Sequence, residues 1–375
     1  MVRYALQFIF ILIILIMATS PSWAAPTDIK TLEIGETAPD FNLPGIDGKD
    51  YSLKDFKEAD LLVIIFTCNH CPTAQAYEDR INQLVHIYHD RGVVVVAVSP
   101  NDPQAVRLDE LGYSDLSDSF EEMKIRAQDK GFKFPYFYDG ENQKVSKAYG
   151  PMATPHVFVF DKERRLRYTG RIDDSEKEER VTTHDTRNAI EALLGGKPVP
   201  VVKTKTFGCS IKWADKRVSA KQGLEQWNKE EVSLSLIDAV GIRALIKNDS
   251  NNLLLINIWA TWCGPCAAEF PELVTLNRMY RQREFELITI SADAPENKDK
   301  ALAFLSKQHA SFTNYLFQSE NKYQLIEAVD EDWPGALPYT LLIAPGGKML
   351  HRQMGRIDPL DMKKRIVSYL GRYYK

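Results

Sequence analysis

The sequence predicts an α/β protein made of two tandem domains, each a mixed β-sheet flanked by helices. Three observations support this. An apolar strand leading into a C-x-x-C motif and a helical pattern occurs twice. Each copy is followed by a second apolar strand and, later, by an X-Pro dipeptide before a strand hairpin. This order implies a mixed sheet with helices on both faces, and 375 residues suit two domains of about 100–200 residues each.

The N-terminus has the pattern of an export signal. Arg3 precedes an apolar run from Tyr4 to Ala18, and Ser22-Trp23-Ala24 places small residues at a cleavage site. The pattern predicts a signal peptide over residues 1–24 and a periplasmic or other extracytoplasmic location. The alternative is an uncleaved membrane anchor, because the run is long enough for a short or tilted span.

The expected elements of the first half follow from apolar runs and turn signals. They are a strand at Leu61–Thr67, a helix ending before Gly92, a buried strand at Val93–Ser99, and a hairpin of His156–Asp161 with Leu166–Ile172.

The second half repeats this order. Its expected elements are a strand at Leu253–Ala260, a helix after the motif, strands at Glu286–Ala292, Tyr339–Ala344 and Met349–Gly355, and a final helix at Pro359–Leu370. The Cys-to-Pro spacing leaves room in both halves for an extra helix and strand. The polar stretch from Asp215 to Glu231 predicts a helical linker, or alternatively a part of one domain.

Four of the five cysteines form two close pairs, Cys68 with Cys71 and Cys263 with Cys266. A disulfide within such a pair closes a very short loop and constrains the unfolded chain little. Redox activity therefore explains the pairs better than a structural role does. A structural zinc site would need two more ligands at matched spacing. Cys209 is left over and is either a third thiol that folds back near Cys68 or a buried, inert residue.

The position of each pair between a strand and a helix predicts its chemistry. A cysteine at the start of a helix faces unpaired N–H groups and the positive end of the helix dipole, which favour the thiolate that attacks disulfides. We therefore expect Cys263 and Cys68 to attack, and Cys266 and Cys71 to resolve the mixed disulfide.

The stretch from Ile258 to Cys266, IWATWCGPC, resembles the thioredoxin superfamily, specifically its exported TlpA/ResA-like branch. The resemblance covers about residues 233–375. It implies that Pro338 is a cis-proline facing the cysteines, that Leu337 presents its backbone to a substrate chain, and that Trp262 belongs to the same substrate-binding surface.

One departure from thioredoxin concerns the base. Asn257 stands where thioredoxin has a buried Asp, whereas Glu269 lies three residues after Cys266, where the TlpA/ResA-like branch often carries a Glu. A partly buried Glu269 with a raised pKa would accept the proton of Cys266. The alternative is a solvated Glu that complements the helix dipole.

The segment Gly35–Phe41 resembles the opening of redoxin domains of the AhpC/TSA type, over about residues 33–213. Residues 214–232 are then the linker. The resemblance implies that Thr154-Pro155 is the cis-proline site that binds substrate. A thiol peroxidase, with its antioxidant role, is a weaker alternative, because the peroxidatic Pro-x-x-x-Thr/Ser-x-x-Cys pattern fails: Val63 replaces the proline and Cys71 lies four residues after Thr67.

His70 lies between the cysteines of the first pair, as in periplasmic disulfide-forming oxidases. Its protonated ring would stabilise the Cys68 thiolate and make the pair more oxidising than the second pair. Electrons would then run from Cys263/Cys266 to Cys68/Cys71, if the linker lets the two centres meet. One alternative is an exposed, weakly coupled His70. Another is a Cu(I) site formed by Cys68, His70 and Cys71, which would make the first half a copper-binding or docking module.

Composition limits the partners. The formal net charge of −4 offers no basic excess for a phosphate backbone, so nucleic-acid binding is not expected. No organic cofactor and no structural metal are implied, because the cysteines carry the electrons. The expected partners are protein thiols and disulfides, together with an electron donor embedded in the membrane. The sequence thus predicts an exported thiol–disulfide oxidoreductase that serves cell redox homeostasis.

Overall fold

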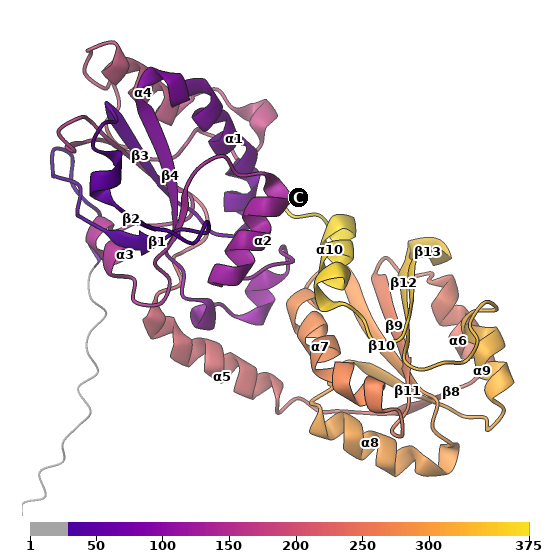
Figure 1. Ribbon diagram of the computed structural model, residues 1–375. Coiled ribbons are helices and arrows are strands. Elements are labelled where there is room, and N and C mark those ends of the chain that lie inside the picture. The colour runs from indigo at the N-terminus through magenta and orange to yellow at the C-terminus, as the bar shows by residue number, and fades with distance from the viewer. Residues whose placement is uncertain (1–28, 375) are drawn as a thin grey trace, which may run out of the picture.

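The computed structural model describes residues 29–374, and its elements gather around two large sheets, with a further two-stranded sheet beside the first (Figure 1). The predicted signal peptide, residues 1–24, lies outside the described residues. Within residues 29–374 no helix combines the length and the apolarity needed to cross a membrane.

The first sheet has the strand order β5-β4-β3-β6-β7. Its central strand β3 pairs in parallel with β4 and antiparallel with β6, and every residue of β3 is buried. An all-apolar run such as LLVIIF is what a strand covered on both faces requires. The strands are β3 (Leu61–Phe66), β4 (Val93–Ser99), β5 (Tyr136–Tyr138), β6 (His156–Phe160) and β7 (Leu166–Gly170).

Helices cover both faces of this sheet. Side chains of α1, α2 and α4 pack on the face that carries Val63 and Ile65, whereas α3 and the chain around β1 pack on the face of Leu62 and Ile64. The elements are β1 (Asn42–Pro44), β2 (Asp50–Ser52), α1 (Pro72–Tyr88), α2 (Phe120–Lys130), α3 (Lys144–Tyr149) and α4 (Asp185–Leu194).

The second sheet has the order β13-β12-β9-β10-β11-β8, with β9 again central. Helices α7, α8 and α10 cover one face, and α6 and α9 cover the other. The strands are β8 (Ser235–Ile237), β9 (Leu253–Trp259), β10 (Phe285–Ser291), β11 (Thr313–Phe317), β12 (Tyr339–Ala344) and β13 (Lys348–Met354). The helices are α6 (Ala239–Lys247), α7 (Gly264–Tyr280), α8 (Lys298–Lys307), α9 (Lys322–Val329) and α10 (Pro359–Leu370).

These two sheets confirm the predicted fold class of two mixed, helix-flanked α/β domains. The room that the sequence leaves in each half holds the predicted extra helix and strand, α2 with β5 in the first half and α8 with β11 in the second. Each half adds one further helix there, α3 and α9, which the sequence did not predict. Short 3-10 turns complete the described chain at Leu53–Phe56, His89–Arg91, Pro103–Ala105, Leu108–Leu111, Glu178–Arg180, Ala214–Lys216, Pro295–Asn297 and Pro345–Gly347.

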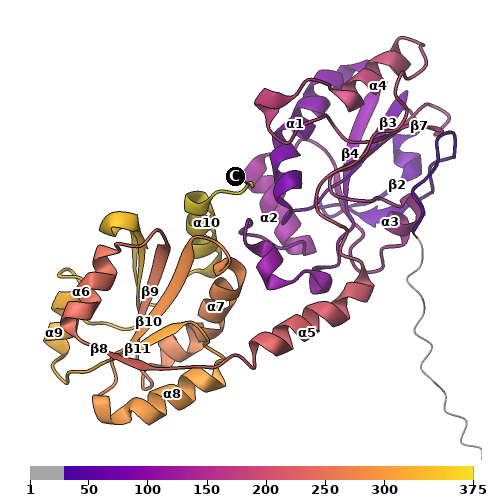
Figure 2. The same ribbon diagram turned by 180° about the vertical axis from the view of Figure 1, so that it is seen from behind.

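Helix α5 (Arg217–Trp227) joins the two halves, where the sequence predicts a helical linker (Figure 2). The side chain of Trp227, the last residue of α5, contacts both halves. The guanidinium of Arg107 from the first half lies 5.7 Å from the Trp227 ring centroid, and that of Arg281 from the second half lies 5.1 Å away.

The two halves also touch directly, away from the linker. The Tyr280 hydroxyl at the end of α7 donates to the carbonyl of Ser114 at 2.9 Å, and Lys364 of α10 pairs with Asp129 of α2 at 2.7 Å. The segment Gly371–Tyr374, called the covering segment below, leaves α10 and reaches the first half, where Arg372 pairs with the buried Asp115 at 2.5 Å.

Candidate active site

The second cysteine pair lies where the sequence predicts it. Strand β9 ends at Trp259, and α7 begins at Gly264, so that Cys263 is the N-cap residue. Its Sγ accepts the backbone N–H of Cys266 at 3.2 Å, and the two cysteines form a disulfide. The first turn of α7 thus directs unpaired N–H groups at the sulfur of Cys263.

A cis-proline loop shares this edge of the sheet. The Leu337–Pro338 peptide bond is cis, as the resemblance implied. Because β12 runs antiparallel to β9 and Tyr339 pairs with Ile258, the start of β12 lies beside the end of β9 that leads to the cysteines. Next to the pair, Trp262 is 67% exposed, which leaves an apolar surface open at this edge.

Glu269 is buried on α7, one turn after Cys266, and is not a solvated residue. Its carboxylate accepts hydrogen bonds from the side chain of Asn257 at 2.8 Å and from the backbone N–H of Ile357 at 3.0 Å. Burial raises the pKa of Glu269, and the two hydrogen bonds offset this only in part. A carboxyl group with a raised pKa is suited to exchange a proton near neutral pH.

The first cysteine pair is shifted by three residues relative to the second. In each sheet, the residue directly after the cis-proline pairs with the central strand: His156 with Phe66, and Tyr339 with Ile258. Counting five residues onward from Phe66 and from Ile258 reaches Cys71 and Cys263, respectively.

Cys71, not Cys68, therefore stands at the N-terminus of its helix, and the expectation for Cys68 is wrong in this respect. Helix α1 begins at Pro72 with Cys71 as the N-cap. The reason is visible in the sequence, because proline is favoured at the first helical position. The position three residues into the helix, which Cys266 holds in the second half, is Ala74 in the first.

Hydrogen-bond donors surround the Cys71 sulfur. Cys71 is fully buried, and its Sγ accepts the N–H of Cys209 at 3.3 Å and of Ala74 at 3.5 Å. The carbonyl of Thr154, in the cis Thr154–Pro155 bond, lies 3.4 Å from the same sulfur and accepts from it only when Cys71 is protonated. Burial opposes ionisation, but hydrogen bonds from Cys209 and Cys68 and the charge of His70 lower the pKa of Cys71 well below its usual value.

Cys68 has the opposite electrostatics. It is 3% exposed, and its Sγ lies 3.2 Å from the Thr154 hydroxyl. Burial, the hydrogen bond to Cys71 and the charge of Asp118 raise the pKa of Cys68 well above its usual value. These contacts support Cys71 as the stabilised sulfur, whereas the sequence predicts that His70 favours a Cys68 thiolate.

His70 is buried rather than exposed, which also overturns the alternative of a solvated ring. Its Nδ1 lies 2.5 Å from Oδ2 of Asp118. Burial lowers the pKa of His70, but the charge and the hydrogen bond of Asp118 outweigh it and raise that pKa. Asp118 in turn accepts the backbone N–H groups of Asn69 and His70 and the side-chain amide of Asn101. No sequence signal singled out Asp118, which lies 48 residues after His70.

Cys209 is a third thiol of this site. The N–H of Cys209 reaches Cys71, so Cys209 lies beside Cys71 rather than near Cys68 alone. Its carbonyl accepts the N–H of Thr154 at 3.0 Å, in an antiparallel bridge. The inert alternative does not describe it well, because it is only partly buried and shares a cluster with both other cysteines.

The covering segment of the second half closes over this site. The ring of Tyr374 packs on that of Tyr113, with centroids 4.9 Å apart. Burial and the neighbouring thiols Cys209 and Cys71 raise the pKa of Tyr374 to about 12. Arg372 also donates to Gln75, one turn into α1. Tyr374 of the second half thus lies next to two thiols of the first, Cys209 and Cys71.

The two cysteine centres do not face each other in this arrangement. The first centre lies beside the C-terminal end of α7, where Tyr280 contacts Ser114 and the Ser114 hydroxyl in turn contacts Asn69. Cys263 lies at the opposite end of α7. The helix spans 17 residues, or about 25 Å at 1.5 Å per residue. Direct disulfide exchange between the centres therefore needs another arrangement of the halves.

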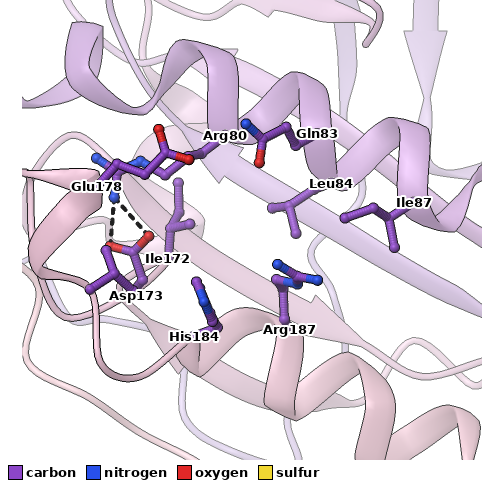
Figure 3. Close-up of a pocket in the computed structure, with 10 residues that line it drawn as sticks. Arg80, Gln83, Leu84, Ile87, Ile172, Asp173, Glu178, His184 and Arg187 are labelled. Carbon is purple, nitrogen blue, oxygen red and sulfur yellow. Dashed lines mark hydrogen bonds and ion pairs between the residues drawn. The ribbon is translucent and has the colours of Figure 1, made fainter.

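A cavity of about 340 Å³ lies on the flank of α1, apart from all cysteines (Figure 3). Two of its charged groups pair with each other: Arg80 binds both carboxylate oxygens of Asp173, at 2.8 and 2.7 Å. Arg80 also donates to the carbonyl of Ser175. The arrangement fixes the loop after β7 against α1 and leaves no unsatisfied charge for a ligand on Arg80 Nη1.

Comparison with known proteins agrees with these features. Residues 34–169 and 237–352 both match the AhpC/TSA family, so most of the chain is covered. The chain belongs to the AhpC/TSA family. The same family matches both halves, in line with the repeated order of elements in the sequence.

Curated relatives add a biochemical context. The chain is 26% identical over 152 residues to the thiol-disulfide oxidoreductase ResA of Bacillus cereus, which covers 39% of this chain and 77% of the relative. It is 29% identical over 121 residues to the thiol:disulfide interchange protein DsbE of Allochromatium vinosum, covering 32% of this chain and 60% of that protein. Among solved structures, an uncharacterized conserved protein from Geobacillus kaustophilus is 38% identical, with a TM-score of 0.44, covering 48% of this chain and 92% of that chain.

Proposed function

We propose that this protein, a thioredoxin-like thiol–disulfide oxidoreductase, is exported and exchanges disulfides with protein substrates at two cysteine centres. The observation that carries the proposal is the N-cap position shared by Cys263 and Cys71, each beside a cis-proline loop. The proposed domains are residues 33–213 and 233–375, joined by the linker 214–232 behind a signal peptide of residues 1–24.

In the second domain, Cys263 attacks a substrate disulfide and Cys266 resolves the mixed disulfide. Cys263 is 6% exposed, whereas Cys266 is fully buried, so an incoming disulfide meets Cys263 first. Glu269 takes the proton of Cys266 as it becomes the attacking thiolate. The exposed Trp262 and the cis-proline loop with Leu337 provide the surface for the substrate chain.

In the first domain, the N-cap position and the N–H groups on its sulfur support Cys71 as the attacking thiol in place of Cys68, although Cys71, unlike Cys263, is fully buried in this arrangement. His70, held by Asp118, and the first turn of α1 stabilise its thiolate. Stabilising the reduced form makes a centre more oxidising, so the first centre has the higher reduction potential. Because the centres lie at opposite ends of α7, we propose that each exchanges electrons with its own partner, including a donor in the membrane.

The test is catalysed reduction of insulin disulfides by dithiothreitol with the full chain. We expect Cys263→Ser and Cys71→Ser each to lose a part of the activity, and the double variant to fall to the uncatalysed rate. Full activity of the double variant would refute the proposal. Cys266→Ser provides a matched control, because it keeps the first attack and should accumulate mixed disulfides at Cys263.

One observation favours a second candidate function for the first domain, binding of Cu(I). Ligand atoms of Cys68, His70 and Asp118 lie within 4.8 Å of one another, with Asp118 in place of the Cys71 that the sequence suggested, and Nε2 of His70 is buried without a partner in the described structure. Thiolate and imidazole ligands suit Cu(I). Titration of Cys263→Ser/Cys266→Ser with Cu(I) tests it: stoichiometric binding lost in His70→Ala would support it, and no binding would exclude it.

A further inference from the structure

The segment Phe207–Cys209 returns to the first domain and occupies the edge of its cis-proline loop. Thr154 donates its N–H to the Cys209 carbonyl at 3.0 Å, which forms a one-rung antiparallel bridge. Gly208 has φ +133°, and a Cβ there would collide with the carbonyl oxygen of Thr154. Only glycine permits this approach, so the backbone of the segment is fixed against the loop.

The second domain leaves the corresponding edge unoccupied. Among residues 29–374, no other segment makes a backbone hydrogen bond to the N–H of Leu337, the residue before the other cis-proline. The two domains thus differ in one respect: the first carries its own cysteine-bearing strand at the edge that the second leaves open.

The first domain also lacks a thiol at the helical resolving position. Ala74 stands three residues after Cys71, where Cys266 follows Cys263. Its N–H is one of two that reach the Cys71 sulfur, and the other belongs to Cys209. Cys209 is therefore held by its own backbone next to the sulfur that would need resolving.

The protonation states of the two thiols are complementary. The hydrogen bond to Cys71 and burial raise the pKa of Cys209, while the same hydrogen bond lowers that of Cys71. The proton therefore resides on Cys209 in the reduced centre, and it becomes transferable once Cys71 is in a mixed disulfide and no longer carries charge.

We propose that Cys209 is the resolving thiol of the first domain and that the oxidised form of this centre is a Cys71–Cys209 disulfide. The proposal rests on Cys71 being the attacking thiol. The Cys71 thiolate attacks one sulfur of a substrate disulfide, forms a mixed disulfide and releases the other sulfur as a thiolate. Cys209 then loses its proton and attacks the Cys71 sulfur, which releases the second substrate sulfur. Two electrons pass to the substrate. One of its sulfurs takes up the proton that Cys209 loses, and the other takes a proton from solvent.

Cys68 is the competitor for this role, and the geometry places it less favourably. It lies in the loop before the helix, at the position that Ala260 holds in the second domain. The Cys68 sulfur contacts the Thr154 hydroxyl at 3.2 Å. Among the described residues, the backbone of Cys68 makes no hydrogen bond to the Cys71 sulfur, unlike the backbone of Cys209. We assign Cys68 to hydrogen bonding with the Cys71 thiolate.

The test uses the full chain carrying Cys263→Ser and Cys266→Ser, so that only the three thiols of the first domain remain. The reduced protein is treated with glutathione disulfide, quenched with acid, alkylated, and mapped by mass spectrometry without reduction. We expect a peptide pair joined through Cys71 and Cys209. Adding Cys209→Ser should raise glutathione bound at Cys71 at least tenfold, whereas the matched control Cys68→Ser should still form the Cys71–Cys209 disulfide.

The outcomes separate two failures. A Cys68–Cys71 disulfide, with glutathione trapped by Cys68→Ser and not by Cys209→Ser, would overturn the role of Cys209 but keep Cys71 as the attacking thiol. Glutathione on no variant, or on Cys68 instead, would overturn the proposed function of the first centre and this inference with it. Cys209→Ala and circular dichroism of every variant exclude loss of folding as the cause of trapping.

Discussion

The replacement Asp118→Asn tests the electrostatics of the first centre. Asp118 is fully buried and accepts two backbone N–H groups through Oδ1, and His70 Nδ1 and Asn101 Nδ2 through Oδ2. An asparagine keeps one oxygen for the backbone groups. The NH₂ group of the asparagine then faces the donors of His70 and Asn101. Both side-chain hydrogen bonds are lost, and His70 remains buried without its counter-ion.

The expected cost follows from these contacts. A hydrogen bond to a charged group contributes about 1.5–3 kcal/mol, so losing two removes about 3–6 kcal/mol. A second argument gives a similar figure, because removing one partner of a buried ion pair costs about 3–5 kcal/mol. We therefore expect Asp118→Asn to lower the free energy of unfolding by about 3–5 kcal/mol, measured by urea denaturation followed by circular dichroism. With a slope of about 1–3 kcal/mol per molar urea, the midpoint falls by about 1 M or more.

The pH dependence of this loss has a defined sign. The folded-state pKa of His70 is raised, so its contribution is complete below the usual His pKa and is lost as the pH rises through the raised value. The folded-state pKa of Asp118 is lowered, so its contribution is present above the usual Asp pKa and is lost as the pH falls through the lowered value. The difference between parent and variant should therefore be larger at pH 5.5 than at pH 9.

The control is Glu121→Gln on α2, which removes an exposed ion pair with Lys124 close to the same loop. Such a pair contributes at most about 1 kcal/mol. If Asp118→Asn shifts the midpoint no more than Glu121→Gln does, or by equal amounts at both pH values, the buried ion pair does not hold the centre as described.

Three further predictions concern the remaining parts of the protein. Glu269→Gln should slow resolution at Cys266 about 100-fold or more, the range of general acid–base catalysis, while the first attack by Cys263 keeps its rate; stopped-flow kinetics of the two steps checks this, and an unchanged pH–rate profile would remove Glu269 from the mechanism. Arg372→Ala should loosen the covering segment and speed alkylation of the first-domain thiols by iodoacetamide at least threefold, whereas the exposed Arg365→Ala should leave that rate unchanged. His70→Ala should lower the reduction potential of the first centre and leave that of Cys263/Cys266 unchanged. An unchanged potential of the first centre would show that His70 does not stabilise the Cys71 thiolate.

The sequence predicts the fold well because apolar strands and turn residues carry local signals. The central strands at Leu61 and Leu253 follow from patterns within a few residues, whereas both cis-prolines were implied by the family resemblance. It also predicts the second centre, since Cys263 and the following Gly and Pro give the helix start directly. In the first centre, Pro72 carried the equivalent signal for Cys71, but the C-x-x-C spacing suggested the wrong register.

The remaining contacts depend on the tertiary fold. Asp118 reaches His70 across 48 residues, and Arg372 reaches Asp115 across 257. Nothing in the local pattern around either residue indicates its partner, because such pairs are set by how loops pack once the sheets have formed. The position of Cys209 depends in the same way on the return of the chain to the cis-proline loop.

The covering segment is synthesised last, which affects when thiols of the first domain become shielded from oxidants. Domains fold largely in the order in which they emerge, at about 5–20 residues per second. Tyr374 follows Cys209 by 165 residues. The covering segment is therefore synthesised on the order of 10–30 seconds after the first domain is complete. In that interval Cys71 and Cys209 lack their contact with Tyr374, so the first centre can be oxidised before the second domain exists.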